Sequence, residues 1–289
     1  MNLREKINAA RARLVAAGIE TGEAGRDANL LARHVLGWDR ATLMTREGND
    51  ATPAFVERYD PLIERRARRE PVAYIRGEQE FWSHDFAVNR AVLIPRPETE
   101  LIIEEFLSFM PDNLPARKAK VLDIGTGSGC LAVVAAAECP LVEVTATDIS
   151  RAALDVARAN AQRYGVQDRI TFVEAAYVGS SMGPFDFILS NPPYVTAAEY
   201  EDLPPEVREY EPVQALVAGE DGLRDIRQII DIASNRLLPG GTALIEIGHQ
   251  HADAVTELVH DFRSLTLKRI SKDLQNIPRV AVIERKITD

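Results

Sequence analysis

The sequence has few cysteines, few histidines and no long apolar run, and each shortage excludes a class of protein. Cys130 and Cys139 are the only cysteines, so a disulfide-rich fold is excluded and a reducing compartment is expected. Neither they nor the five histidines follow a metal-ligand spacing, so no metal site is expected. The chain lacks the roughly 18 consecutive apolar residues of a membrane-spanning helix, and its first residues lack the apolar core of a signal peptide. We therefore expect a cytoplasmic protein without a membrane partner.

Positive charge is also scarce. The sequence has 34 lysines and arginines against 44 aspartates and glutamates, which gives a net charge of -10. A protein that coats nucleic acid through a broad basic face carries the opposite excess, so we expect no stable nucleic-acid binding. One local basic cluster, between Arg65 and Arg69, is either a solvated helix face or a docking surface. The 289 residues suffice for one core of ordinary size and a second small one, and we expect a monomer.

Residues 1–72 predict a small bundle of three or four short helices. Leu3 and Ile7 share one helical face, and Gly37 is placed to end a second helix. Thr52, followed by proline, has the sequence of a helix cap and predicts the start of another helix. A bundle of this size cannot hold a cofactor alone, so we assign it to substrate recognition.

After residue 72 the sequence contains two further segments with different patterns. Residues 73–97 are rich in aromatics and short of helical periodicity, which predicts a β-hairpin linker. Strand-like and helix-like segments alternate from 98 to 289, after a break expected at 111–115, and this predicts an α/β domain with a mostly parallel sheet covered on both faces. Pro239-Gly240-Gly241 is expected to be a turn before the fifth strand. The strands are expected at 121–124, 141–147, 170–173, 185–190, 243–247, 265–269 and 280–285.

A glycine-rich loop joins the first of these strands to a helix, in the order Asp123-Ile124-Gly125-Thr126-Gly127-Ser128-Gly129. Its glycines permit positive φ and remove the Cβ atoms that would keep a ligand from the backbone. The third glycine comes one residue earlier than in the dinucleotide fingerprint, and this spacing resembles the S-adenosylmethionine loop of Rossmann-like methyltransferases. The alternative is a turn that binds nothing. Asp148 ends the next strand, where its carboxylate can either accept both hydroxyls of a ribose or cap the following helix.

The turn Asn191-Pro192-Pro193-Tyr194 follows the strand expected at 185–190, and open α/β sheets place ligands at such carboxyl ends. An amide or exocyclic nitrogen is a poor nucleophile because its lone pair is delocalised. The Asn191 side-chain oxygen and the Pro192 carbonyl can each accept one hydrogen of a substrate NH2 group, which turns the lone pair toward a methyl donor. The prolines stiffen the turn, and Tyr194 offers a flat face to a planar group. These residues predict methyl transfer to a planar NH2 group.

With these motifs, the chain resembles the bacterial peptide chain release factor glutamine N5-methyltransferases, the HemK/PrmC-like family. Further matching segments are Pro71-Val72-Ala73-Tyr74-Ile75, Ile94-Pro95-Arg96-Pro97-Glu98-Thr99-Glu100, Gly219-Glu220-Asp221-Gly222-Leu223 and Leu238-Pro239-Gly240-Gly241. The resemblance implies a Rossmann-like class I methyltransferase sheet, with 98–289 as the S-adenosylmethionine-binding catalytic domain. It also implies S-adenosyl-L-methionine as cofactor, which leaves as S-adenosyl-L-homocysteine, and class 1 release factors as partners, methylated on the glutamine of their Gly-Gly-Gln motif.

The resemblance also implies roles for individual residues. Donor-binding residues would be Asp123, Gly125, Thr126, Gly127, Ser128, Gly129, Asp148, Tyr177 and Asn191. Residues that bind the glutamine would be Arg96, Glu98, Asn191, Pro192, Pro193 and Tyr194, of which Asn191, Pro192 and Tyr194 would act in catalysis. The chain departs from the family at Ala176, where an acid usually precedes the aromatic Tyr177.

Three alternatives are open at this point. The first is a glutamine methyltransferase of a ribosomal protein, which would share this architecture and turn. The second is an N-methyltransferase of an exocyclic amine in DNA or RNA, which would need a basic groove and a pocket for a flipped base. The third is a non-catalytic module that keeps the donor fold as a scaffold.

Overall fold

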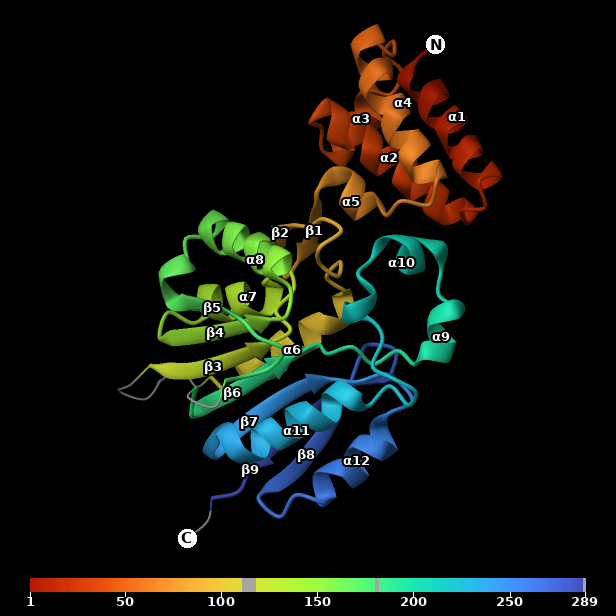
Figure 1. Cartoon of the computed structure of the whole chain (residues 1–289). Coiled ribbons are helices and arrows are strands. Elements are labelled where there is room, and N and C mark those ends of the chain that lie inside the picture. Colours follow the sequence, from red (N-terminus) through yellow and green to blue (C-terminus); the bar gives the residue numbers. More distant parts are fainter. Residues whose placement is uncertain (111–117, 180–181, 288–289) are drawn as a thin grey trace. The chain divides into compact units, whose positions relative to one another are not determined.

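The structure is a computed structural model that describes residues 1–110, 118–179 and 182–287 (Figure 1). The break expected at 111–115 lies outside the described residues. The chain forms two compact units. The N-terminal unit comprises Met1–Glu78 together with Pro204–Tyr210, and the sheet unit comprises Gln79–Leu203 together with Glu211–Asp289. A short segment from late in the sequence therefore belongs to the N-terminal unit.

The N-terminal unit is the helical bundle that the sequence predicts. Its helices are α1 (Leu3–Ala16), α2 (Thr21–Leu36), α3 (Arg40–Arg46), α4 (Pro53–Ala67), α5 (Val72–Arg76) and α10 (Pro205–Tyr210). Gly37 ends α2 in the left-handed conformation, and the Thr52 side chain accepts a hydrogen bond from the Phe55 N–H at the start of α4. Leu14, Leu31 and Tyr59 are fully buried between the helices. Apolar burial between α1, α2 and α4 thus stabilises the bundle.

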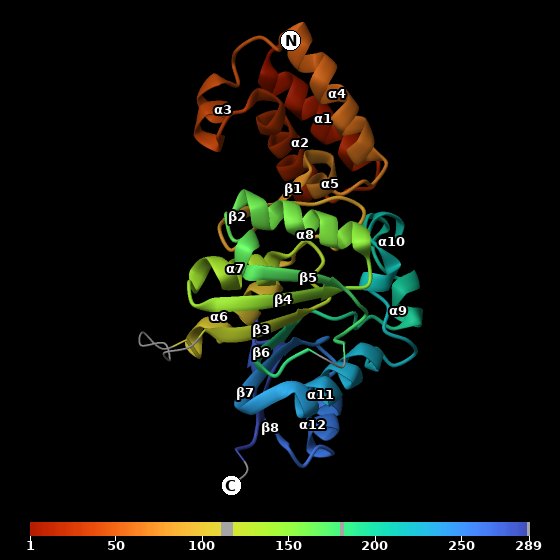
Figure 2. The ribbon, with the colours of Figure 1, turned by 60° about the vertical axis from the view of Figure 1, so that its left-hand side comes forward.

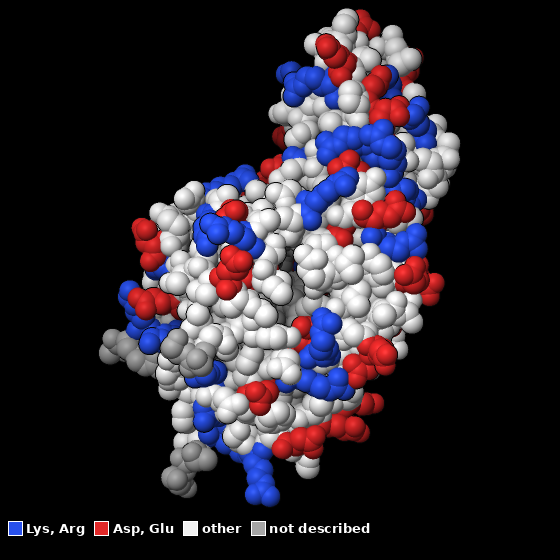
Figure 3. All heavy atoms as spheres, viewed as in Figure 1, with Lys and Arg blue, Asp and Glu red and all other residues white. Residues whose placement is uncertain are grey.

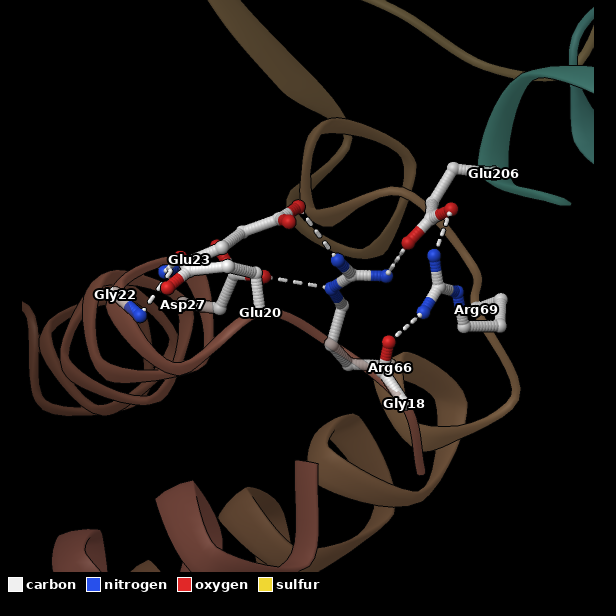
Figure 4. A network of polar contacts seen from close by, with 8 residues as sticks. All are labelled: Gly18, Glu20, Gly22, Glu23, Asp27, Arg66, Arg69 and Glu206. Atoms are coloured by element: carbon white, nitrogen blue, oxygen red, sulfur yellow. Dashed lines mark hydrogen bonds and ion pairs between the residues drawn. The ribbon is translucent and has the colours of Figure 1, made fainter. Parts of the chain in front are cut away.

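A buried arginine joins α10 to this bundle (Figure 4). The Arg66 side chain is 1% exposed, and its guanidinium donates hydrogen bonds to Asp27 at 2.6 Å, Glu23 at 2.8 Å and Glu206 at 2.9 Å. Glu206, on α10, also accepts a hydrogen bond from Arg69 at 2.7 Å. Neither role that we considered for the cluster between Arg65 and Arg69, a solvated face or a docking surface, describes Arg66. The buried charge is compensated within the unit, as buried ions require.

The sheet unit contains a two-stranded hairpin and a seven-stranded sheet in the order β5-β4-β3-β6-β7-β9-β8. The hairpin strands are β1 (Glu78–Phe81) and β2 (His84–Ala87). The sheet strands are β3 (Ala119–Ile124), β4 (Val142–Asp148), β5 (Ile170–Glu174), β6 (Phe185–Ser190), β7 (Leu237–Glu246), β8 (Leu265–Lys272) and β9 (Pro278–Arg285). The strands from β5 to β7 are parallel, and β9 pairs antiparallel with both of its neighbours.

Helices cover both faces of the sheet (Figure 2). Successive strand residues point to opposite faces, so Val121 packs in one core and Leu122 in the other. One face packs against α6 (Glu100–Ser108), α7 (Cys130–Glu138) and α8 (Arg151–Arg163), and the other against α11 (Arg224–Arg236) and α12 (Ala252–His260). Shorter elements are η1 (Pro97–Thr99), η2 (Gln167–Arg169), α9 (Ala197–Glu201) and η3 (Val213–Ala215). The predicted α/β fold with a small helical bundle and a hairpin is confirmed.

The turn predicted before the fifth strand is wrong. Pro239-Gly240-Gly241 is part of β7, which begins at Leu237, rather than a turn before the strand. The pairing with β6 shifts register between Phe185 and Phe187, so the glycines accommodate an irregularity inside the strand. A Cβ on Gly241 would lie 2.9 Å from the Asp186 carbonyl oxygen, which explains why only glycine fits there.

None of the helices in the described ranges is long and apolar enough to cross a membrane. Figure 3 shows acidic and basic side chains interspersed over the face that it presents.

Candidate active site

A cavity of about 360 Å³ lies where β3, β4 and β6 end, and all the residues that line it belong to the sheet unit. It brings together eight of the residues that the sequence singled out: Gly125, Thr126, Gly127, Ser128, Asp148, Tyr177, Asn191 and Pro193. These come from the carboxyl ends of three neighbouring parallel strands and from the loop after β5. The topology therefore assembles the predicted glycine loop, the acid and the turn at one edge of the sheet.

The structure requires glycine at the three loop positions for different reasons. Gly125 and Gly127 have φ angles of +70° and +54°, in the left-handed region, and both line the cavity. A Cβ on Gly125 would meet no protein atom within 4 Å, so the space beside it is open. Gly129 does not line the cavity. A Cβ there would lie 3.0 Å from the Ala157 Cβ, so this glycine lets the start of α7 approach α8.

Asp123 supports the loop from inside the protein. It is fully buried and does not line the cavity. Its Oδ2 accepts hydrogen bonds from the Thr126 hydroxyl at 2.6 Å and the Ala132 N–H at 3.2 Å, and its Oδ1 has no hydrogen-bond partner among the described residues. Burial raises the pKa of this carboxyl to about 7. The carboxylate thus fixes the loop and the first turn of α7 to the end of β3.

Asp148, at the end of β4, lines the cavity and contacts the loop. Its Oδ2 accepts a hydrogen bond from the Gly127 N–H at 2.9 Å, and its Oδ1 accepts one from the Ser150 N–H at 2.8 Å. Burial raises the pKa of the Asp148 carboxyl, although these N–H groups oppose the shift. Each oxygen has a further lone pair, so the carboxylate can still accept two hydroxyl groups.

Tyr177 lines the same cavity, next to Ala176. Its hydroxyl donates a hydrogen bond of 2.7 Å to Asp225 at the start of α11, and burial raises the pKa of Tyr177 to about 12. The phenol is therefore neutral and its ring is fixed beside the cavity. Nothing in the spacing of the sequence indicates that Asp225 also lines this cavity.

Hydrogen bonds connect the turn after β6 to two distant segments. The Asn191 Nδ2 group donates to the Thr99 Oγ1 at 2.9 Å, and the Thr99 hydroxyl donates to the Glu246 Oε2 at 2.7 Å. The Tyr194 hydroxyl donates to the other Glu246 oxygen at 3.3 Å. Thr99 and Glu246 are 2% and 1% exposed. Thr99 lies in a segment that matches the family pattern, yet no spacing in the sequence pairs positions 99 and 246.

The four turn residues do not all lie at the first cavity. Asn191 and Pro193 line it, whereas Pro192 is buried and lines neither of the cavities described here. Tyr194 lines a second cavity of about 320 Å³, together with Gly248 and His251. Burial, with the nearby Glu246, raises the pKa of the Tyr194 hydroxyl.

Arg96 and Glu98, predicted to bind substrate, do not line the first cavity, although their neighbours Pro95 and Thr99 do. The Arg96 guanidinium pairs with Glu211 at 2.5 Å. The other Glu211 oxygen accepts a hydrogen bond from the Ile94 N–H at 3.1 Å. Arg96 therefore holds the segment before η1 against the segment that begins at Glu211.

Two family models match the chain. The PrmC N-terminal domain matches residues 5–77, and the methyltransferase small domain matches residues 104–203. A release factor glutamine methyltransferase of Koribacter versatilis is 40% identical over 288 residues, which cover 100% of both chains. One of Cereibacter sphaeroides is 42% identical over 259 residues, which cover 90% of each chain.

Solved structures share the fold at low identity. The hMettl16 catalytic domain in complex with MAT2A 3'UTR hairpin 1 is 15% identical, with a TM-score of 0.57 over 85% of each chain. A methyltransferase from Pyrococcus furiosus is 19% identical, with a TM-score of 0.51 over 78% of this chain and 99% of the other.

Proposed function

Because the chain belongs to the release factor glutamine methyltransferase family, we propose that it methylates the side-chain amide nitrogen of the glutamine in the Gly-Gly-Gln motif of class 1 release factors. The methyl donor is S-adenosyl-L-methionine. The observation that carries the proposal is Asn191, whose side chain lies at the cavity with its nitrogen already bound to Thr99. Its oxygen has no donor among the described residues, so it can accept a hydrogen from a substrate NH2 group.

The cavity residues fit the donor. Asp148 offers carboxylate oxygens to the two ribose hydroxyls, and the loop from Gly125 to Ser128 lets a ligand approach the backbone closely. Tyr177 and Ile149 supply apolar surface for the adenine ring. Ala176 contributes no polar group, so recognition of the base falls to other lining residues. Asp123 and Gly129, which do not line the cavity, act by shaping the loop.

When bound, the donor supplies a methyl group on a positively charged sulfur, and transfer breaks the S–CH3 bond, forms an N–CH3 bond and releases a proton from the nitrogen to water. The chain's part is to position the acceptor. The Asn191 Oδ1 accepts one hydrogen of the glutamine NH2 group, and the Pro192 carbonyl accepts the other. Held in this way, the nitrogen keeps its lone pair free for attack.

We assign recognition of the release factor to the N-terminal unit. None of its residues lines the first cavity, whose lining comes entirely from the sheet unit. Tyr194 acts through its hydroxyl on Glu246 instead of through a flat face at the first cavity. Arg96 acts through Glu211, by holding the segment that carries Thr99.

Substrate choice is tested by incubating the full chain with methyl-labelled donor and, separately, a class 1 release factor, ribosomal proteins and nucleic acid. We expect label in the release factor, on the motif glutamine. A release factor with glutamate at that position should stay unlabelled because it lacks the NH2 group. Label confined to ribosomal protein or to nucleic acid would overturn the proposal.

The role of Asn191 is tested with Asn191→Ala. Loss of a preorganised polar contact to the reacting group should lower kcat by about 100-fold or more. Donor affinity, measured by calorimetry, should stay close to that of the original chain. Asn235→Ala, on α11 and outside the cavity lining, is the matched control and should retain activity. If donor affinity falls as far as turnover, Asn191 belongs to the donor site and the assigned role is wrong.

A further inference from the structure

Three residues that are far apart in the sequence form a continuous chain of hydrogen bonds beside the cavity. Asn191 follows β6, Thr99 ends η1, and Glu246 ends β7. The bonds run from Asn191 Nδ2 to Thr99 Oγ1 at 2.9 Å, and from Thr99 Oγ1 to Glu246 Oε2 at 2.7 Å. Glu246 does not line the cavity, so these bonds connect it to Asn191, which does.

The direction of these bonds follows from counting protons. An ionised carboxylate can only accept, so the single hydroxyl proton of Thr99 is directed to Glu246. The Thr99 oxygen is then left with lone pairs alone, and it can only accept from Asn191. This requires the Asn191 NH2 group to face Thr99 and turns its Oδ1 away from Thr99.

The orientation matters because the two ends of an asparagine amide have nearly the same shape, so packing alone discriminates poorly between them. In the flipped orientation, the Asn191 NH2 group would face the NH2 group of the substrate. Two donors would then oppose each other, and the substrate nitrogen would lose the acceptor that holds its hydrogen.

We propose that Thr99 and Glu246 are positioning residues, which fix the Asn191 amide with its oxygen toward the NH2 group of the substrate. This inference rests on the proposed function, because it assumes that Asn191 accepts a hydrogen from the glutamine. Neither residue touches the reacting atoms: Thr99 acts through Asn191, and Glu246 acts through Thr99.

Tyr194 supports the same arrangement from the other side. Its hydroxyl donates to the Glu246 Oε1, so both carboxylate oxygens accept hydrogen bonds. The charged and titratable groups around Glu246 come from several elements: Glu98 from η1, Tyr194 from the turn, Arg279 from β9 and Cys130 from α7. Burial raises the pKa of Glu246 to about 7, while Thr99, Tyr194 and Arg279 oppose this shift and Glu98 adds to it.

The pH dependence follows from these groups. The arrangement needs the ionised carboxylate, because a protonated Glu246 can donate to Thr99 and release the Thr99 proton toward Asn191. Since the raised pKa lies near 7, the active form is lost as the pH falls through that value. Turnover at saturating substrates should therefore decline below about pH 7, and Asp123, whose pKa burial also raises to about 7, can add to this decline.

Thr99→Val and Thr99→Ser test the proposal directly. Valine keeps the shape of threonine but removes the hydroxyl, whereas serine keeps the hydroxyl. With a full-length release factor as substrate, we expect Thr99→Val to lower kcat by about 100-fold and Thr99→Ser to restore most of it. Donor affinity should change little in both. Thr99→Val should also lower Tm, because it removes a buried hydrogen-bond partner of Glu246 and Asn191, whereas Thr99→Ser should keep most of the stability. Thr256→Val, at an exposed position on α12, is the matched control and should behave like the original chain.

Glu246→Gln supplies the second measurement. Glutamine does not titrate, so the part of the decline below pH 7 that Glu246 causes should disappear from the kcat profile even if overall turnover falls. The positioning role is wrong if Thr99→Val keeps its kcat, if Thr99→Ser is as impaired as Thr99→Val, or if the acid limb of the kcat profile is unchanged in Glu246→Gln. The proposed function fails separately, when the unaltered chain does not label the release factor at all.

Discussion

Replacing Arg66 with methionine would test the buried ion network of the N-terminal unit. The guanidinium is 1% exposed and lies between the carboxylates of Asp27, Glu23 and Glu206. Methionine occupies much of the same space but leaves these carboxylates without their shared cation. Removing one partner of a buried ion pair costs about 3–5 kcal/mol, because an uncompensated charge stays buried.

The exposure of each carboxylate narrows the expected loss of stability. Glu23 has a side chain that is 44% exposed and can turn to water, and Glu206 keeps its second partner, Arg69. The Asp27 side chain is only 12% exposed, so its carboxylate would be the least able to turn to water and would contribute most to the loss of stability. We therefore expect a loss near the lower limit, about 3 kcal/mol, or roughly 12 °C or more in the Tm of a unit of this size. Burial already raises the pKa of Asp27, so a proton can neutralise it in the variant, and the deficit should shrink as the pH is lowered.

The assay can observe the N-terminal unit alone. The chain has two tryptophans, Trp38 in the N-terminal unit and Trp82 in the sheet unit, so a Trp82→Phe background leaves Trp38 fluorescence as the reporter of urea unfolding. Arg13→Met is the matched control, because Arg13 pairs with Glu64 on the surface, with 54% and 45% of the two side chains exposed. It should cost less than about 1 kcal/mol. Equal losses in the two variants would refute the reasoning from burial.

Substitutions at three further positions test the sheet unit. Gly129→Ala should destabilise it by about 2–3 kcal/mol in urea unfolding, because the new Cβ would meet Ala157 at 3.0 Å and φ is +82°. Asp148→Asn should weaken donor binding by about 10- to 100-fold in calorimetry, because hydrogen bonds to a carboxylate are lost, while turnover at saturating donor changes less. Arg96→Met should cost about 3 kcal/mol in urea unfolding, because the Glu211 side chain is 1% exposed, and Arg96→Lys should recover part of it by keeping a cation. Donor binding unaffected by Asp148→Asn, or unfolding unaffected by the other two, would contradict these roles.

The local sequence pattern is sufficient to predict the positions of most strands of the sheet. The strand expected at 185–190 is β6 without change, because an apolar run bounded by a proline turn has few other interpretations. The sequence also predicts that the glycine loop and Asp148 lie at the same edge of the sheet, since neighbouring parallel strands end side by side. The error at Pro239 to Gly241 arose because these residue types indicate turns, while in β7 they permit an irregular strand.

Side-chain pairings between distant segments cannot be predicted from local sequence pattern. Thr99 meets Glu246 only because η1 lies at the end of β7, and neither position has a spacing that reveals the other. Arg66 looked like one member of an exposed basic run. In the structure it is buried, and one of its partners, Glu206, comes from a segment about 140 residues later. Helical periodicity near position 66 cannot indicate a partner so far along the chain.

The interleaving of the two units has a consequence for domain exchange. The chain leaves the sheet unit after Leu203, contributes Pro204–Tyr210 to the N-terminal unit, and returns at Glu211. A single cut near residue 78 therefore yields a sheet unit with a stranded segment, whose Glu206 has lost both of its arginines. Grafting the N-terminal unit of one relative onto the sheet unit of another would need two crossovers instead of one. Recombination that respects both boundaries would keep Glu206 with Arg66 and Arg69, whereas recombination at one boundary would separate Glu206 from both arginines.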